Sequence, residues 1–413
     1  MSYSLKIMLL AVFLSGFYPA KSQLLLIKDA VDQAIQNNAQ INQLRSQLKQ
    51  RKEEWRLQTG IMAPEISYLK EGIGSKGADP FQEQRISLSQ SVDFPLTTSY
   101  RLKAIREEVK ALEFHIQAEE RQVKAGVKSR YIEVIYSLYL QKLRNQQMKL
   151  ATEIYNAVYT RFETGMGNGM DLTKAELQVA DANNDIDDAR RQLHLARYGL
   201  FNLMGLNPEN QKYTTEFMDT LRSVDVDISQ IQALNVLTDQ PAYKSAEKEF
   251  SAANYFLKEA RSNLLPDLKF SLYKQDYGTG YNFNGFEVGL IFPIWYPLEQ
   301  RGRINTTLAR QDEIRWKQQE IRLDVKKQIE FAWHSYEVSR STVKRYDETI
   351  RSKAEKLQSL TLIAYRLGEV DLLNLINAQQ IYLNSQERYL SALQDFYIQL
   401  VELEKFFNKD LVF

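Results

Sequence analysis

The sequence predicts a mainly helical protein with a small β part, built from two tandem repeats that each combine a β-hairpin with long antiparallel helices. Three observations lead to this fold class. A glycine-containing turn motif occurs twice, and the apolar period switches from 3.6 to 2 residues once in each half. In addition, two very long stretches are almost free of glycine and proline, which is typical of extended helices.

The turn motif is the clearest sign of the repeat. Residues 162–176 read Phe-Glu-Thr-Gly-Met-Gly-Asn-Gly-Met-Asp-Leu-Thr-Lys-Ala-Glu, and residues 365–379 read Tyr-Arg-Leu-Gly-Glu-Val-Asp-Leu-Leu-Asn-Leu-Ile-Asn-Ala-Gln. An aromatic residue, a glycine, a leucine and an alanine recur at one constant offset. The pairs are Phe162 with Tyr365, Gly165 with Gly368, Leu172 with Leu375, and Ala175 with Ala378. A period near half the chain indicates one structural unit used twice.

Residues 1–22 have the pattern of a secretory signal peptide. Lys6 supplies the positive charge, residues 7–17 form a short apolar region, and Ala20 and Ser22 are the small residues of a cleavage site. The whole chain carries 53 basic and 52 acidic residues. Without Lys6 and Lys21 the net charge becomes about −1, so the chain has no general electrostatic reason to bind nucleic acid. It contains no cysteine, which excludes disulfides, thiolate metal sites and an N-terminal lipid anchor.

The first repeat, residues 23–206, begins with a predicted helix over Asp29–Thr59, which Gly60 and Pro64 end. Its counterpart in the second repeat, residues 239–413, is predicted over Asp239–Asn263, with Asp239 as the N-cap and Pro241 in the first turn. Residues 207–238 lack a clear period, and we expect a mixed linker there.

After each of these helices, apolar and polar residues alternate as they do in half-buried strands. Strands are predicted over residues 84–94, 268–273 and 286–292, with a weaker one over 66–70, and loops rich in Gly, Asn and Asp join them into two hairpins. Alternation alone favours a surface hairpin packed on helices. The equivalent places of the two hairpins and the predicted export favour membrane-crossing strands, for which roughly nine tilted residues suffice.

Each hairpin ends in a Phe-Pro pair, at Phe94-Pro95 and at Phe292-Pro293, and a very long helix is predicted next. Residues 97–161 and 303–366 would each extend for roughly 100 Å at 1.5 Å per residue. After each turn motif, residues 171–203 and 373–407 are predicted to return as antiparallel partners. Fewer residues separate the two Phe-Pro pairs than separate the two turn glycines. The second repeat therefore has a few additional residues between its Phe-Pro pair and its turn, and the sequence does not show where they lie.

In this order and spacing, the chain resembles the TolC family of outer-membrane efflux and secretion channels. The resemblance rests on residues 29–38, Pro241-Ala242-Tyr243, Leu264-Leu265-Pro266, the Phe-Pro pairs, Gly302-Arg303 and the two turns. It implies a homotrimer in which each copy adds four strands to a twelve-stranded outer-membrane β-barrel that continues as a periplasmic helical barrel. The residues expected to face lipid are Ile86, Leu88, Val92, Leu268, Phe270, Leu272, Phe286, Val288 and Leu290.

The resemblance also implies roles for the two turns. A periplasmic adaptor would dock on Gly165, Met166, Gly167, Gly368, Glu369 and Val370, and Asp171, Tyr365, Asn374 and Asn377 would constrict the pore. Other family members carry carboxylates at the positions of Asn374 and Asn377 and an arginine at that of Val370. Asn374 and Asn377 are equally interpretable as polar residues near a helix start. Glu369 and Asp371 lie close enough to supply charge instead.

From the two asparagines we predict a weaker cation preference than in channels with an acidic ring, because symmetry-related carboxylates attract cations and asparagines do not. Reversal potentials under a salt gradient measure this preference. Strong cation selectivity, blocked by a trivalent metal ion bound at Asn374 and Asn377, would contradict the prediction.

No enzymatic motif emerges from the sequence. Gly165-Met-Gly167-Asn-Gly169 lacks the lysine and the preceding strand of a phosphate-binding loop. His115, His194 and His334 are isolated, whereas metal sites need clustered donors. We therefore predict no catalysis, cofactor or metal site.

The predicted function is a passive exit duct of a tripartite efflux pump or type I secretion system, which exports small molecules, metals or polypeptides and depends on a periplasmic adaptor and an inner-membrane pump. The predicted location is the bacterial outer membrane, with an extension into the periplasm. The alternative is a soluble periplasmic coiled-coil scaffold or adaptor, which would not need strands with one apolar face.

Overall fold

A computed structural model describes residues 23–73, 82–207, 213–214, 226, 228–278, 280–292, 294, 299–407 and 410–412. The predicted signal peptide, Pro293 and most of the predicted linker lie outside the described residues. The chain divides into two units, which we describe separately. Unit 1 comprises Met1–Ala39, Glu120–Ala233 and Ile329–Phe413, and unit 2 comprises Gln40–Glu119 and Leu234–Gln328. Each unit contains segments of both predicted repeats.

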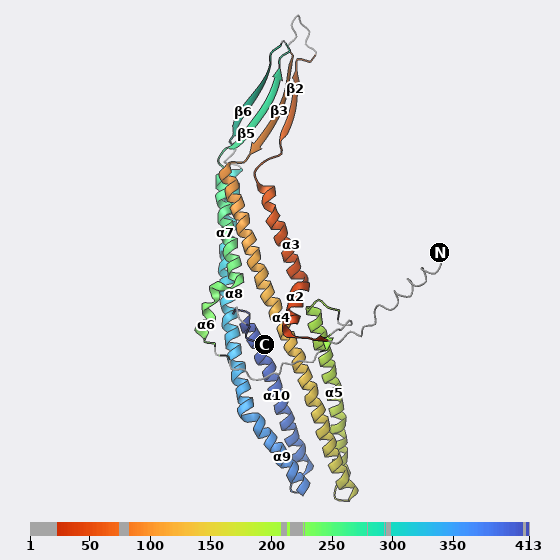
Figure 1. The fold of residues 1–413 in the computed structure, drawn as a ribbon. Coiled ribbons are helices and arrows are strands. Elements are labelled where there is room, and N and C mark those ends of the chain that lie inside the picture. Colours follow the sequence, from red (N-terminus) through yellow and green to blue (C-terminus); the bar gives the residue numbers. More distant parts are fainter. Residues whose placement is uncertain are drawn as a thin grey trace, which may run out of the picture. The chain divides into compact units, whose positions relative to one another are not determined.

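Unit 2 carries one antiparallel sheet that contains both predicted hairpins (Figure 1). Its strands are β2 (Glu65–Glu71), β3 (Glu83–Val92), β5 (Asp267–Asp276) and β6 (Asn282–Ile291), in the order β2-β3-β5-β6. The hairpins are joined by β3 and β5, which pair from Gln84 with Asp276 to Val92 with Leu268. The prediction that the two hairpins lie together is therefore confirmed.

One face of this sheet is apolar and exposed. A row of facing residues crosses all four strands, from Ile66 through Leu88 and Leu272 to Phe286. The predicted lipid-facing residues share this character: Ile86, Leu88, Phe270, Leu272, Phe286, Val288 and Leu290 are exposed, and Val92 and Leu268 are half-buried. An exposed apolar patch of this extent needs to be covered by an apolar partner or by an apolar solvent.

The opposite face is polar and internally hydrogen-bonded. The hydroxyl of Ser67 lies 2.6 Å from that of Ser87, and the hydroxyl of Ser89 lies 2.9 Å from that of Ser271. The ring of Tyr273 covers Gly285, where an added Cβ would lie only 2.3 Å from the ring. An aromatic side chain over a strand glycine supplies the packing that the glycine lacks.

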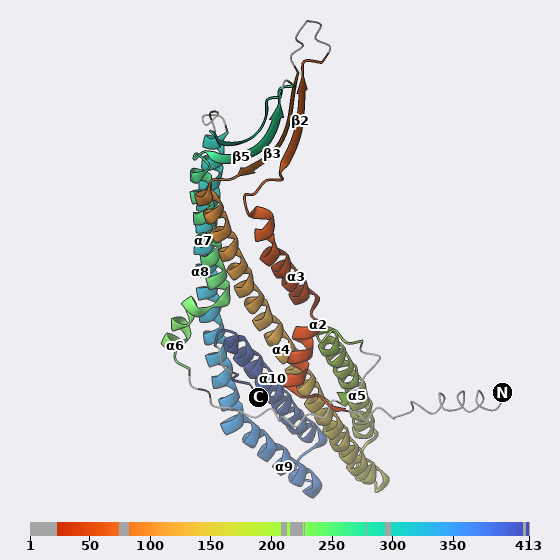
Figure 2. The same ribbon diagram turned by 45° about the horizontal axis from the view of Figure 1, so that its top comes forward.

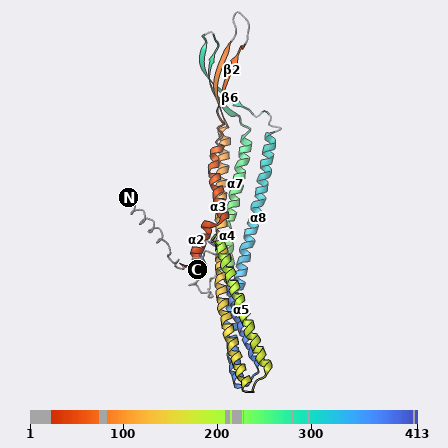
Figure 3. The ribbon, with the colours of Figure 1, turned by 90° about the vertical axis from the view of Figure 1, so that its right-hand side faces the viewer.

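The helices of unit 2 lie side by side in the same order as the strands that they adjoin (Figure 3). Its elements are α3 (Ala39–Glu54), η1 (Trp55–Gln58), the first part of α4 (Pro95–Glu163), η3 (Leu237–Asp239), α7 (Pro241–Ser262) and the first part of α8 (Gln300–Arg345). Arg51 of α3 forms an ion pair with Glu108 of α4. Ser245 of α7 donates a 2.8 Å hydrogen bond to the carbonyl of Ala111 in α4. Since α7 also contacts α8, the helices follow the same order as the strands that they adjoin.

Unit 1 consists mainly of two antiparallel helical pairs (Figure 2). Its elements are α2 (Ile27–Asn37), the remainder of α4, α5 (Gly169–Leu203), the end of α8, the π-helical turn η4 (Tyr346–Ile350), α9 (Arg351–Leu367), α10 (Leu372–Glu404) and the short parallel strands β1 (Gln23–Leu24) and β4 (Tyr213–Thr214). α6 (Gln230–Asn235) lies at a unit boundary. Arg144 of α4 joins the pairs, because it contacts Asp185 of α5 at 3.9 Å and Glu387 of α10 at 2.9 Å.

A buried ion cluster fixes the chain after α10 in unit 1. The ammonium of Lys128, which is 3% exposed, lies 2.5 Å from the carboxylate of Glu404. The other oxygen of Glu404 accepts the backbone N–H groups of Leu411 and Val412 at 3.0 and 3.1 Å. Because each buried charge has a partner, the segment packs without an uncompensated ion.

Three predicted element boundaries were wrong. The predicted helix over Asp29–Thr59 is broken at Asn38, whose extended backbone ends α2, and asparagine has a low helix propensity. Asp239 is not an N-cap: it lies in η3, and Gln240 precedes α7. The predicted single helix over residues 303–366 contains the π-helical turn, which inserts into a helix without glycine or proline and therefore leaves no simple sequence signal.

The structure also locates the residues that shift the register of the repeats. α4 begins at Pro95, directly after Phe94, whereas α8 begins only at Gln300, after Phe292 and an intervening corner. The additional residues therefore lie between Phe292 and Gln300, a stretch of which Pro293 and residues 295–298 are outside the described part.

No helix among the described residues contains an apolar stretch long enough to cross a membrane.

A partly buried arginine connects the sheet to the helices in unit 2. Arg101 of α4 lies 2.7 Å from Asp93, at the end of β3, and 2.6 Å from Glu259 of α7. Burial opposes the charge of the guanidinium, but hydrogen bonds and attraction to Glu259 and Asp93 outweigh it and raise the pKa of Arg101. The arginine therefore links a strand end of the first repeat to a helix of the second.

We predict that Arg101→Met destabilises the folded protein by about 3 kcal/mol, because two sheltered carboxylates lose their common counter-ion. Thermal unfolding followed by circular dichroism measures the effect. Arg106→Met, an exposed position on the same helix, is the matched control. Equal unfolding temperatures for the two variants would contradict a connecting role for Arg101.

Candidate functional site

The two turns of unit 1 have the same backbone hydrogen bonds. In the first turn, the N–H of Gly165 donates to Phe162 at 3.0 Å, and the next N–H donates to the carbonyl of Arg161 at 2.9 Å. The second turn repeats both bonds at 3.0 and 2.9 Å, from Gly368 and the residue after it. Gly165 and Gly368 have φ values of 73° and 79°, which favour glycine over residues with a Cβ. The repeat predicted from the sequence thus extends to the geometry of its turns.

The helices after the two turns have the same kind of N-cap, but Asn and Asp exchange places between the two turns. Asn168 precedes α5, and its side-chain oxygen accepts the N–H of Asp171 at 2.8 Å. Asp371 precedes α10, and its carboxylate accepts the N–H of Asn374 at 2.8 Å. Because Asn and Asp are both good N-caps, the exchange keeps each helix start intact. It moves the carboxylate from the third helical position in the first turn to the cap in the second.

The second turn is held by an apolar cluster formed with the first helical pair. Tyr365 is only 5% exposed and lies at the centre of this cluster. The buried members are Ile154, Val158, Ala175, Tyr365, Leu372 and Leu375. Residues from α4, α5, α9 and α10 therefore meet at the turns of unit 1.

Arg161 is the residue at this site that the sequence analysis missed. Its guanidinium lies 5.2 Å from the centre of the Tyr365 ring, a favourable cation–π distance. Burial raises the pKa of Tyr365, whereas Arg161 acts in the opposite direction and the nearby charge of Asp171 adds to the increase. The available signal was an asymmetry of the repeat, because Arg161 precedes the aromatic residue where the second repeat has Ala364.

The structure brings only some of the predicted gate residues together. Tyr365 is within electrostatic reach of both Arg161 and Asp171, and Asp171 lies 4.0 Å from Lys174. Asn374 and Asn377 are exposed on α10 and are not members of the apolar cluster.

Most of the predicted docking residues are exposed. Gly165, Met166, Gly368 and Glu369 are exposed, whereas Gly167 and Val370 are half-buried.

No metal centre is available in the part of the chain that the structure describes. Within it, no three or more His, Cys, Asp or Glu side chains are placed to hold an ion.

The fold and the turns define a class of protein: a channel protomer with a strand-forming part, a helical part and paired helical turns. In the comparison with protein families, the outer membrane efflux protein family model matches residues 30–206. The resemblance noted in the sequence to TolC-type outer-membrane efflux channels, which are non-enzymatic transport proteins, is confirmed.

Two curated relatives are similar over most of the chain. The cobalt-zinc-cadmium resistance protein CzcC of Cupriavidus metallidurans is 22% identical over 299 residues, which cover 71% of this chain and 70% of CzcC. The pyoverdine export outer membrane protein OpmQ of Pseudomonas aeruginosa is 23% identical over 331 residues, which cover 76% of this chain and 65% of OpmQ.

Solved structures show the same fold. A membrane protein from Pseudomonas aeruginosa matches with a TM-score of 0.78 and 18% identity, over 94% of this chain and 95% of that chain. The outer membrane channel CmeC of Campylobacter jejuni matches with a TM-score of 0.77 and 16% identity, over 92% of this chain and 85% of CmeC. Channels of this family form trimers, and the predicted fold class is confirmed.

Proposed function

We propose that three copies of this chain form the outer-membrane exit duct of a tripartite efflux system, with a periplasmic adaptor and an inner-membrane pump as partners. The observation that carries the proposal is the sheet of unit 2, whose exposed apolar face spans all four strands. A scaffold or adaptor protein has no use for such a face. The names of the relatives describe cobalt-zinc-cadmium resistance and pyoverdine export, which supports small molecules or metal ions as the exported class.

The edges of the sheet support the assembly. β2 and β6 are its outer strands, so each leaves one side of its backbone without a partner in the described sheet. An open edge in lipid would leave N–H and C=O groups unsatisfied at a cost of several kcal/mol each. Pairing β2 of one copy with β6 of the next satisfies them all, and three copies close the sheet on itself.

A stripe of exposed apolar residues on α8 supplies a helical interface. It consists of Leu308, Trp316, Leu323, Phe331 and Val338, which recur every seven or eight residues along one side of the helix. Trp316 and Phe331 are 66% and 73% exposed. Such a period is typical of a seam between helices, and we assign this seam to a neighbouring copy.

We predict that Phe331→Asp prevents the trimer from forming, because it replaces about 2 kcal/mol of apolar burial per copy with a charge that must be desolvated. Light scattering of the purified protein in detergent measures the oligomeric state. Arg322→Asp places the same carboxylate at an exposed position of the same helix, about two and a half turns from Phe331 and therefore on the opposite side, and serves as the control. A trimer that persists in Phe331→Asp would exclude the α8 stripe as the interface.

The cluster around Tyr365 supports a role for the turns as the gate of the duct. Arg161 holds the second helical pair to the first through the aromatic ring of Tyr365, near the carboxylate of Asp171. Separation of the two turns requires this contact to break. In this proposal Arg161 supplies the positive charge that other family members place at the position of Val370.

We predict that Arg161→Met increases the mean single-channel conductance in planar bilayers, because loss of 1–2 kcal/mol of attraction shifts the population of open channels about 5- to 30-fold. Tyr365→Phe keeps the ring and should increase the conductance less. Arg366→Met alters a neighbouring exposed arginine and should leave the conductance unchanged. Equal conductance in Arg161→Met and the wild type would remove Arg161 from the gate.

A further inference from the structure

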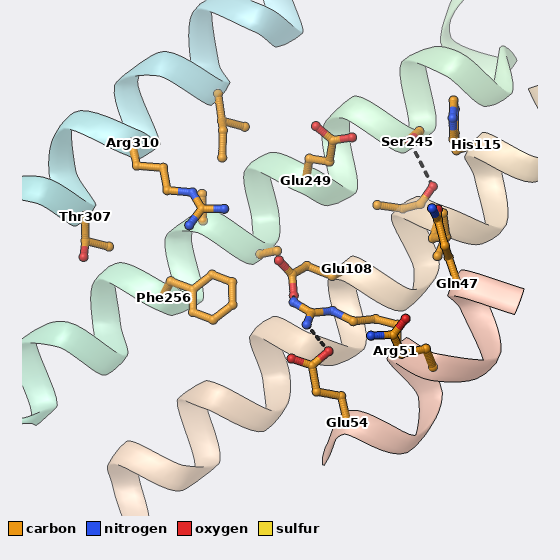
Figure 4. A pocket seen from close by; sticks show the side chains of 16 residues that line it. Gln47, Arg51, Glu54, Glu108, His115, Ser245, Glu249, Phe256, Thr307 and Arg310 are labelled. Carbon is orange, nitrogen blue, oxygen red and sulfur yellow. Dashed lines mark hydrogen bonds and ion pairs between the residues drawn. The ribbon is translucent and has the colours of Figure 1, made fainter. Parts of the chain in front are cut away.

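The helices of unit 2 enclose a cavity of about 430 Å³ (Figure 4). α3, α4, α7 and α8 all contribute to its lining. The proposed function places these helices in the wall of the duct, and we assign the cavity to the inner side of that wall. This step rests on the proposed function.

Each carboxylate of the cavity has a basic partner. Arg51 forms ion pairs with both Glu54 and Glu108, and Figure 4 shows its guanidinium between them. Glu249 pairs with Lys317 at 2.9 Å. A cation would therefore have to displace an existing partner, and no group of donors among the described residues is arranged for a metal ion.

One positive charge in the lining has no counter-ion. Arg310 makes no hydrogen bond or ion pair with any residue that the structure describes. Figure 4 shows its side chain extending from α8 toward α7, on the side of the cavity where the ring of Phe256 lies. A guanidinium recognises carboxylate, sulfonate or phosphate groups through paired N–H donors, and an aromatic ring binds a flat apolar body.

We propose that this cavity binds organic anions that carry a flat aromatic body, with Arg310 on the anionic group and Phe256 on the ring system. The volume lies within the range of sites for small organic molecules. Leu112 and Ile314 add apolar lining. The site would hold such compounds transiently on the wall of the duct during export.

Binding of naphthalene sulfonate to the full-length trimer in lipid nanodiscs tests the proposal, with ligand-observed NMR as the readout and empty nanodiscs as the blank. We expect Arg310→Gln to weaken binding about 10- to 100-fold, which corresponds to one charge-assisted contact. Arg322→Gln is the matched control, because Arg322 is an exposed arginine of α8 outside the cavity lining. Phe256→Leu should weaken naphthalene sulfonate severalfold and leave the weak binding of methanesulfonate unchanged.

Three results would overturn the proposal: no binding to the wild type, equal binding to wild type and Arg310→Gln, or equally tight binding of uncharged naphthalene methanol. Oligomeric state and conductance are measured on the same preparations. A conducting trimer that does not bind the probe rejects only the cavity site, whereas a protein that neither trimerises nor conducts rejects the proposed duct itself.

Discussion

The pairing of β3 with β5 is the interaction on which the rest of the structure of unit 2 depends. Each hairpin alone has two strands, too few for a stable sheet. The antiparallel ladder between β3 and β5 joins them, aligns the apolar residues of both repeats in common rows and sets the order in which the adjoining helices follow. The two repeats are therefore parts of one structure.

Charge pairs carry this order from the strands into the helices. Arg101 joins the end of β3 to α7, and the next contacts along the same helices are Lys248 with Glu107 and Arg51 with Glu108. Exposed ion pairs contribute little, but a sheltered arginine between two carboxylates specifies one arrangement, because any other leaves a charge without a partner. The small residues Ala111 and Ser245, between α4 and α7, allow the close approach that these pairs require.

Sequence patterns predicted the elements that depend on local periodicity. The alternation around Leu88 and Leu272 predicted strands that the structure confirms, and the repeat of Gly165 in Gly368 predicted two turns of the same geometry. The patterns failed where a single residue or a tertiary contact decides. Asn38 breaks a helix that the apolar stripe continues through, and the contact between Arg161 and Tyr365 joins residues two hundred positions apart with no shared periodicity.

The exchange of Asn and Asp between the turns explains why the position of the charge at each turn was hard to predict from the sequence. An N-cap needs one side-chain oxygen aimed at a backbone N–H, and both residues supply it, so folding does not constrain which of the two positions is charged. In the first turn the charge is at Asp171, close enough to Tyr365 to affect its pKa, and in the second it is at the cap residue Asp371. Because stability is indifferent to this choice, the same fold is free to vary its charges at the turns. A motif that identifies the fold therefore does not determine the charges at the turns, which must be derived from the contacts of each chain.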